Sequence, residues 1–240
     1  GVMVESSTIK SIEGFNIEGV TTKKYIKGIG TTTNGVVIVN SEIASLATWK
    51  QDASYDDYIG GFARINNRLP LSSITASGVK IVSSEITSTK GINIEGEIGE
   101  SLYGSAVQVI SSNIQAISLD DSPNADLTII GNVGNDEDAL SPVKSALLSK
   151  SFGDKPMTTQ GSFISSSLIS ASGSLEISGS LNEGLASSPL RNRYSNAILV
   201  YDSAINAGFD ISINGAGASP LKSGGSMNSH GVSIALSDIR

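Results

Sequence analysis

Residues Gly78–Gly96 read GVKIVSSEITSTKGINIEG, and imperfect copies of this stretch recur along the whole chain. Its first nine residues form a block that occurs seven times, with copies beginning at Gly1, Gly35, Gly78, Ala106, Gly161, Ala197 and Gly231. Every copy has an apolar residue at its fourth place, Ser at its seventh place and Ile at its ninth place. Repetition at fixed positions indicates a repeat architecture.

Within the block, apolar residues at places two and four alternate with more polar or variable ones, which predicts a strand with one buried face. Place one is Gly or Ala in every copy, which suits a tight corner. Most copies continue with a small residue and then an apolar-x-Ile-x-Gly ending, as at Ile92–Gly96. The second copy shows no clear ending after Ser45, and the seventh stops at Arg240. Each unit thus holds three short strands separated by corners of small residues.

One such unit cannot bury its own Ile and Val side chains, but stacked copies bury them in a continuous column. We therefore expect an all-β fold, a right-handed parallel β-helix of about seven coils, that spans residues 1–240 as one shaft. At the usual spacing between strands the rod would be roughly 34 Å long.

The serine at place seven occupies the same corner of every coil. Hydroxyl groups both donate and accept hydrogen bonds, so a stacked series of them can satisfy the polar groups at the bend. We expect a structural corner ladder rather than a repeated nucleophile, because no base accompanies these residues. The ladder comprises Ser7, Ser41, Ser84, Ser112, Ser167, Ser203 and Ser237.

Two long excursions are expected between the coils, at about residues 47–77 and 132–160. The first is rich in aromatic and charged residues and is the candidate ligand-contact loop, since variable loops on a regular scaffold commonly carry binding. The alternative is that its rings only pin a long loop against the side of the helix. In the second, acidic residues precede Ser141–Leu148, which predicts one short amphipathic helix. The candidate contact residues are Trp49, Tyr55, Asp56, Asp57, Tyr58, Phe62 and Arg64.

The composition of the chain argues against several classes of function. The net charge of −7 leaves no basic stripe for nucleic acid, and no apolar run approaches the length of a membrane helix. The chain has no Cys and a single His, so thiolate chemistry is absent and histidine chemistry has little support. We expect no cofactor, no metal site and no catalytic residue.

The cadence of the repeat, clearest at Gly78–Gly96 and Ala197–Gly215, resembles that of filamentous-haemagglutinin-like exoproteins. Gram-negative bacteria secrete these by the two-partner route, and they include high-molecular-weight adhesins. The resemblance implies an extracellular or cell-surface shaft that takes part in adhesion and virulence. It also implies an outer-membrane transporter as partner during secretion, and a protein or glycan of a host cell or bacterium as ligand. Because both ends fall within repeats, we expect an interior fragment of a longer chain.

The alternative function is a carbohydrate-active β-helix, such as a polysaccharide lyase, a hydrolase or a phage tailspike. Such an enzyme needs charged residues clustered at equivalent places of neighbouring coils. The nine-residue blocks carry mainly Ser and small residues there. The sequence therefore favours an adhesive shaft over an enzyme.

Overall fold

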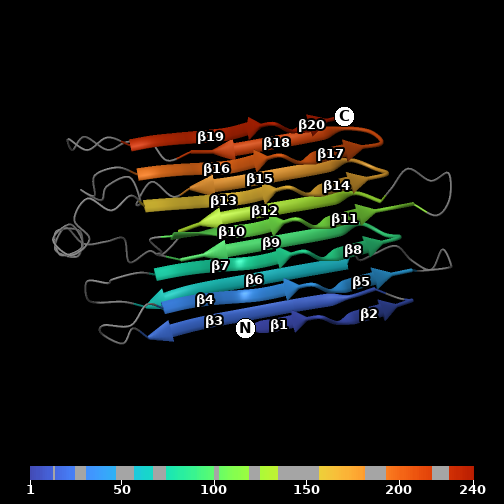
Figure 1. Cartoon of the computed structure of the whole chain (residues 1–240), viewed down its shortest axis with the longest axis horizontal. Helices are drawn as coiled ribbons and strands as arrows, with labels where there is room; N and C mark the ends of the chain where they lie inside the picture. Colours follow the sequence, from blue (N-terminus) through green and yellow to red (C-terminus); the bar gives the residue numbers. More distant parts are fainter. Residues whose placement is uncertain are drawn as a thin grey trace.

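The repeated blocks lie on top of one another, coil upon coil, in the computed structural model of the chain (Figure 1). The structure describes residues 1–12, 14–24, 31–46, 57–66, 74–99, 103–118, 125–134, 157–181, 193–217 and 227–240. All elements within these ranges are strands, and they form three parallel sheets of seven, seven and six strands. The expected all-β parallel solenoid of about seven coils is confirmed.

Each coil contributes one strand to each sheet, except that the last described coil contributes none to the third. Sheet A contains β1 (Val2–Glu5), β4 (Thr31–Val39), β7 (Ile74–Val82), β10 (Tyr103–Ile110), β13 (Met157–Ser165), β16 (Arg193–Tyr201) and β19 (Met227–Ala235). Sheet B contains β2 (Thr8–Ser11), β5 (Glu42–Ser45), β8 (Glu85–Ser88), β11 (Asn113–Ala116), β14 (Leu168–Ala171), β17 (Ala204–Ala207) and β20 (Asp238–Ile239). Sheet C contains β3 (Asn16–Lys24), β6 (Asp57–Asn66), β9 (Ile92–Ile98), β12 (Leu127–Val133), β15 (Leu175–Leu181) and β18 (Ile211–Ala216).

Equivalent residues of successive coils stack in register, so the core is a set of columns. Ile81 pairs with Ile38 on one side and Val109 on the other, and all three are fully buried. Ile94 holds the same kind of position in sheet C, between Ile59 and Ile129. Each buried Ile contributes about 1.5–3 kcal/mol relative to its exposed state. Stacking thus supplies the burial that a single coil lacks.

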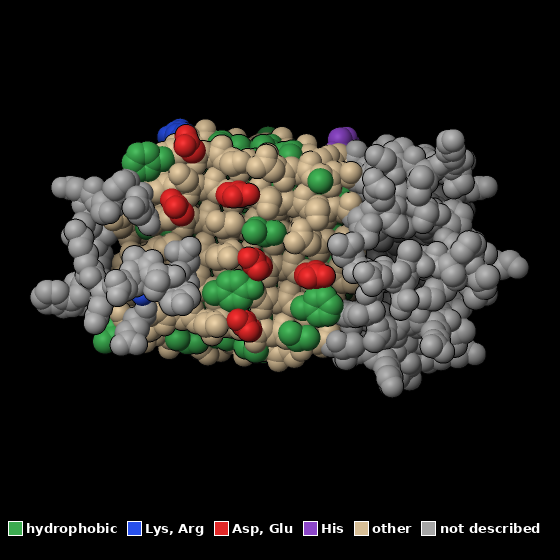
Figure 2. All heavy atoms as spheres, turned by 180° about the vertical axis from the view of Figure 1, so that it is seen from behind, with side chains coloured by type: hydrophobic (Ala, Val, Ile, Leu, Met, Phe, Trp, Pro, Cys, Tyr) green, Lys and Arg blue, Asp and Glu red, His purple; other side chains and the backbone are tan. Residues whose placement is uncertain are grey.

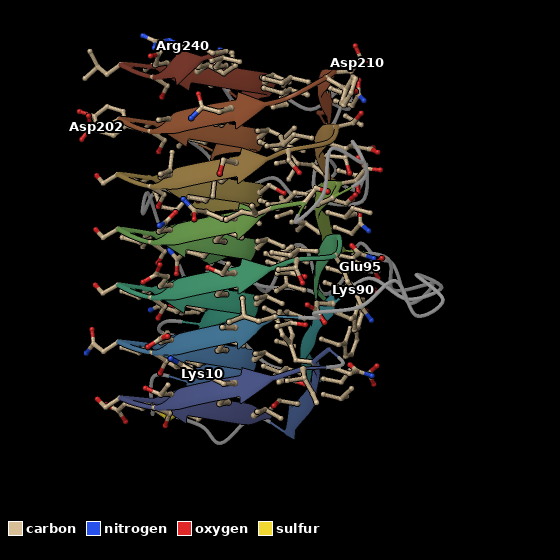
Figure 3. All side chains as sticks on the ribbon, turned by 90° about the vertical axis from the view of Figure 1, so that its right-hand side faces the viewer. Lys10, Lys90, Glu95, Asp202, Asp210 and Arg240 are labelled. Carbon is tan, nitrogen blue, oxygen red and sulfur yellow. The ribbon has the colours of Figure 1, made fainter. Side chains whose placement is uncertain are left out.

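The corner between sheets A and B is built the same way in every coil. The residue at place six has a left-handed backbone, with φ between 48° and 53°, in all seven copies. Short polar residues tolerate this conformation best after glycine, and six of the seven are Ser, Asn or Asp. The side chains of this position form a column along one edge of the rod that includes Asp202 (Figure 3).

The invariant serine follows directly and links the coils. The Ser112 hydroxyl donates to the Ile110 carbonyl at 2.7 Å and accepts the Ser84 backbone N–H at 3.1 Å. The same pair of bonds recurs from coil to coil, down to the bond from Ser203 N–H to Ser237 Oγ at 3.2 Å. From Ser41 onward, each serine therefore closes its own bend and ties it to the preceding coil.

Place one is not a corner, which corrects the reading of its small residues. Gly35, Gly78 and Ala106 lie within β4, β7 and β10, and these strands begin several residues before the repeated block. The small side chain is needed because sheet C passes close by. A Cβ added at Gly96 would collide with the carbonyl group of Ala106. The chain therefore needs glycine at the end of the repeat as well.

Strand residues at the edge of the repeat form a second, smaller apolar cluster. Two of its members hold place one of the block, and the other five are residues that the repeat pattern leaves in connections. Its members are Ala63, Ala76, Ile98, Ala106, Val133, Leu181 and Ala197. The coil is therefore wider than the repeated unit, and the excursions are correspondingly shorter.

The first long excursion is interrupted by a strand, so its expected extent of 47–77 is wrong. Asp57–Asn66 forms β6, which pairs with β3 and β9 and supplies the missing third strand of the second coil. The apolar-x-Ile-x-Gly ending of this coil was not recognised in the sequence because Asp57 stands at its first, apolar place, where the next coil has Ile92. At the second excursion, Asn132 and Val133 belong to β12 and β13 begins at Met157. The predicted helix at 141–148 lies outside the described residues.

Candidate ligand-binding groove

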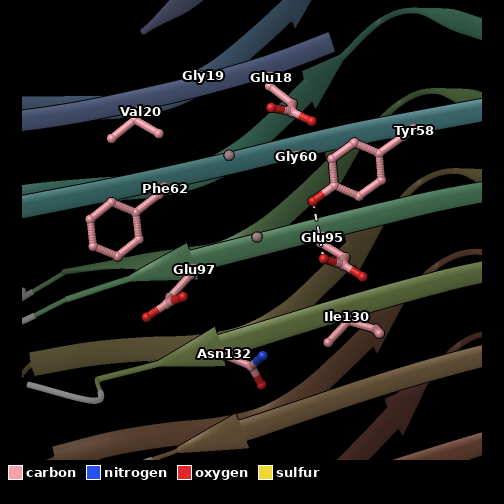
Figure 4. A pocket seen from close by; sticks show the side chains of 12 residues that line it. Glu18, Gly19, Val20, Tyr58, Gly60, Phe62, Glu95, Glu97, Ile130 and Asn132 are labelled. Carbon is pink, nitrogen blue, oxygen red and sulfur yellow. Dashed lines mark hydrogen bonds between the residues drawn. The ribbon is translucent and has the colours of Figure 1, made fainter. Parts of the chain in front are cut away.

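A shallow groove of about 320 Å³ lies on the outer face of sheet C (Figure 4). Alternate residues of a strand point to opposite faces of its sheet, so the groove takes every second side chain of its strands. These strands are β3, β6, β9 and β12, from four neighbouring coils. The polar and aromatic side chains that line it are Glu18, Tyr58, Phe62, Glu95, Glu97 and Asn132.

The parallel register places these side chains in rows across the strands. One row holds Glu18, Gly60, Glu95 and Ile130. The next row, two residues further along each strand, holds Val20, Phe62, Glu97 and Asn132. Carboxylates, apolar groups and an amide thus alternate over a small area.

Gly60 opens the groove and sets the orientation of Tyr58. A Cβ at Gly60 would overlap the ring carbons and hydroxyl of Tyr58, so this ring lies over the glycine, along the strand. The hydroxyl group then reaches the next coil. Glycine at this outward position is what allows Tyr58 to lie flat between the neighbouring carboxylates.

Glu95 is held from two sides. The Tyr58 hydroxyl donates to Oε2 at 3.0 Å, and the Asn93 side-chain amide donates to Oε1 at 2.9 Å. Burial raises the pKa of Tyr58 to about 12, and the hydrogen bond to Glu95 together with the charges of Glu95 and Glu18 act in the same direction. Tyr58 therefore stays a neutral hydrogen-bond donor at physiological pH.

The described lining contains three glutamates and no Lys or Arg. Figure 2 shows the same character on the face it presents: acidic and large apolar side chains lie together near the centre, with almost no basic groups. Phe62 is partly buried and Val20 is 69% exposed, so the apolar surface beside the carboxylates is accessible to a partner. This combination makes the groove both acidic and aromatic.

The candidate contact residues of the first excursion divide into three groups. Tyr58 and Phe62 line the groove, on a strand rather than on a loop. Asp57 is only 1% exposed, faces the interior, and accepts the Phe15 N–H at 2.7 Å. Arg64 belongs to β6, but its side chain lies outside the described part of the structure, and so do residues 49, 55 and 56 entirely.

Sequence reasoning missed Glu18, Glu95, Glu97 and Asn132. A signal was present: the tetrapeptide Asn-Ile-Glu-Gly occurs twice, at 16–19 and 93–96, and the strand between them carries Tyr58–Gly61. In both copies the Asn side chain donates to the Glu two residues later, at 3.3 Å in the first and 2.9 Å in the second. Sequence reasoning gave the repeated blocks mainly Ser and small residues, but Glu42 and Glu85 hold equivalent places of neighbouring coils there. On sheet C, Glu18 and Glu95 hold equivalent places two coils apart, with Gly60 between them.

The serine ladder lies beside a second, more open hollow at the corner of sheets A and B, of about 800 Å³. Glu42 and Glu85 also line it and are neighbours in the register, and Glu42 pairs with Lys10 at 3.0 Å. The hydroxyls of the ladder donate to backbone carbonyls two residues earlier, as Ser84 does to Val82 at 2.8 Å. Their hydrogen-bonding capacity is used in holding the corner.

Within the described ranges, no group of three or more His, Cys, Asp or Glu residues is arranged to hold a metal ion. The same part of the chain contains no helix that is long and apolar enough to cross a membrane. No protein-family model, curated protein or solved structure matches this chain.

Proposed function

We propose that this chain is an adhesive segment of the shaft of a large bacterial surface protein, of the filamentous-haemagglutinin-like kind. The observation that carries the binding part of the proposal is the groove on sheet C, where Tyr58 and Phe62 lie beside Glu95 and Glu97. Partly exposed aromatic groups among fixed polar groups are typical of recognition surfaces. The serine ladder and the stacked core supply the rigid rod on which such a surface is displayed.

The proposed ligand is a protein or glycan on a host cell or a neighbouring bacterium. Localisation at the cell surface, and passage through an outer-membrane transporter, are proposed from the resemblance of the repeats to secreted shafts. The absence of cysteine is compatible with that route, because a chain that crosses membranes unfolded gains from having no disulfide to close early. In place of the protruding loops expected from sequence, the proposed contact surface is the groove on sheet C formed by β3, β6, β9 and β12.

The test is a binding screen of the intact chain against immobilised glycans, extracellular-matrix proteins and whole cells. Replacing Tyr58 and Phe62 together by Ala should abolish or strongly reduce the binding, because both rings line the groove. Matched controls are Phe209→Ala, which removes a ring that is 61% exposed elsewhere, and Glu176→Gln on an outer position of β15. Binding that survives the double substitution would remove sheet C from the proposal, and a chain that bound none of the ligands would overturn it.

A carbohydrate-active enzyme is the second candidate, favoured by one observation. Glu18, Glu95 and Glu97 face one groove from strands of the first and third coils, as the carboxylates of lyases and hydrolases do. The test is incubation with a polysaccharide panel and detection of new reducing ends or unsaturated uronates. Turnover that disappeared in Glu95→Gln and persisted in Glu176→Gln would establish the enzyme.

A further inference from the structure

We infer that the groove on sheet C, which spans four coils, binds an uncharged glycan. This inference rests on the proposed adhesive function and names its ligand. The lining extends from β3 to β12, which at the usual strand spacing is roughly 14 Å. A short stretch of a polysaccharide chain fits in a groove of this size.

The aromatic rings suit the apolar faces of sugar rings. The Tyr58 ring lies over Gly60, so it offers a flat surface along the sheet. Phe62 stands in the neighbouring row between Val20 and Glu97 and extends that surface. Sugars bind such platforms because their C–H groups pack on the ring while their hydroxyls stay free for polar partners.

The polar groups suit sugar hydroxyls. Each carboxylate has about four acceptor positions, so Glu95 still accepts after its bonds from Tyr58 and Asn93. Those two bonds fix the carboxylate before the ligand arrives, which lowers the entropic cost of binding. Glu97 adds acceptors, and Asn132 in the same row adds both a donor and an acceptor.

Charge selects against acidic ligands. The three glutamates repel uronate, sulfate and sialic-acid groups, and no basic side chain among the described lining residues offsets them. A basic peptide would satisfy the charge, but Glu95 is bonded to two neutral donors, a phenol and an amide. Those two bonds show that neutral donors, of the kind that a sugar hydroxyl supplies, fit this carboxylate.

The experiment is affinity electrophoresis of the intact chain through gels that contain neutral polysaccharides, namely β-glucan, mannan or xylan, or the acidic polygalacturonate and alginate. At least one neutral polymer should retard the chain and the acidic ones should not. Phe62→Ala should raise the dissociation constant roughly tenfold or more, as truncation of a central aromatic contact does. Phe209→Ala and Glu176→Ala are the matched controls and should leave it unchanged. Circular dichroism and thermal melting establish that each variant is folded.

Salt separates the sugar from a basic partner. Binding of an uncharged glycan should change little as salt is raised, whereas binding of polylysine to the same carboxylates should weaken strongly. Three results would overturn the inference: unchanged glycan binding in Phe62→Ala, equal binding of acidic polymers, or binding of polylysine with no neutral polymer bound. If no neutral polymer binds while cells or matrix proteins do, the glycan inference fails and the adhesive proposal stands.

Discussion

Removing one hydroxyl from the middle of the serine ladder should cost far more stability than removing one from its end. In Ser112→Ala, the donor to the Ile110 carbonyl is lost, but that carbonyl keeps the Ser83 N–H at 2.9 Å. This loss costs about 0.5–1.5 kcal/mol. The Ser84 N–H loses its acceptor, and Ser84 is only 5% exposed, so water cannot readily replace it. An orphaned buried donor costs about 1–3 kcal/mol, and the sum is about 1.5–4.5 kcal/mol.

Ser7→Ala is the matched control. The Ser7 hydroxyl donates to the Glu5 carbonyl at 2.8 Å in an exposed setting, and no N–H of another described residue donates to it. Its removal should cost less than about 1 kcal/mol. The comparison holds the chemistry of the substitution constant and changes only the place in the rod.

The assay is urea unfolding followed by circular dichroism, with the slope against denaturant compared between variants. Repeat rods can unfold in parts, so an unchanged slope is needed before free energies are compared. If Ser112→Ala lay within about 0.5 kcal/mol of wild type, or cost no more than Ser7→Ala, the ladder would not stabilise the corner as argued.

Three further predictions concern the corner, the glycine column and the groove. Ser111 has φ of 49°, so Ser111→Val should destabilise by about 1–2 kcal/mol and Ser111→Gly should not, as measured by urea unfolding. Gly96→Ala should destabilise by about 1–3 kcal/mol or more, seen as a lower melting temperature, because its methyl group meets the Ala106 carbonyl. The pKa of Tyr58, about 12 when folded against 10.0 when unfolded, means that the folded chain keeps a proton the unfolded chain loses. Stability should therefore fall as pH rises from about 10 to about 12, and Tyr58→Phe should show a smaller fall between these pH values in unfolding titrations.

The solenoid was predictable because stacked coils require the same kinds of residue at equivalent positions. The backbone at the corner needs the same hydrogen-bond partner in all seven copies, and serine occupies that place in each of them. The left-handed residue before the serine was less visible, since Leu236 holds that place alongside Ser, Asn and Asp. Several residue types adopt the left-handed conformation at place six, so the sequence varies there. Only serine makes the corner hydrogen bonds at place seven, so the same residue recurs in every copy.

The groove was harder to predict because its members belong to different coils and are not repeated. Tyr58 and Phe62 were identified as candidates, but only the register places them beside Glu95 and Glu97. The third strand of the second coil was missed because a polar residue, Asp57, stands at the first, apolar place of its ending. A second departure is Gly60, which stands at a variable place of the ending where the first and third coils have glutamate. Neither departure recurs at the equivalent places of the other described coils.

Asp57 provides a test of whether these departures serve the groove rather than stability. Its carboxyl group lies in a column that is otherwise apolar, as Phe15 and Ile92 show, and it accepts the Phe15 N–H at 2.7 Å. Its Oδ2 has no hydrogen-bond partner in the described part of the chain. Asp57→Leu loses that bond and orphans an N–H, about 1–3 kcal/mol, but gains a buried apolar side chain, about 1.5–3 kcal/mol.

The two terms nearly cancel, so Asp57→Leu should leave the unfolding midpoint close to wild type. Asp57→Ala loses the bond and leaves a cavity, so it should lower the midpoint clearly. If the bond from Phe15 to Asp57 positions the start of β6, ligand binding should weaken in both variants, because Tyr58 is the next residue. A stable Asp57→Leu variant with undiminished binding would show that the buried carboxyl group does not position the groove.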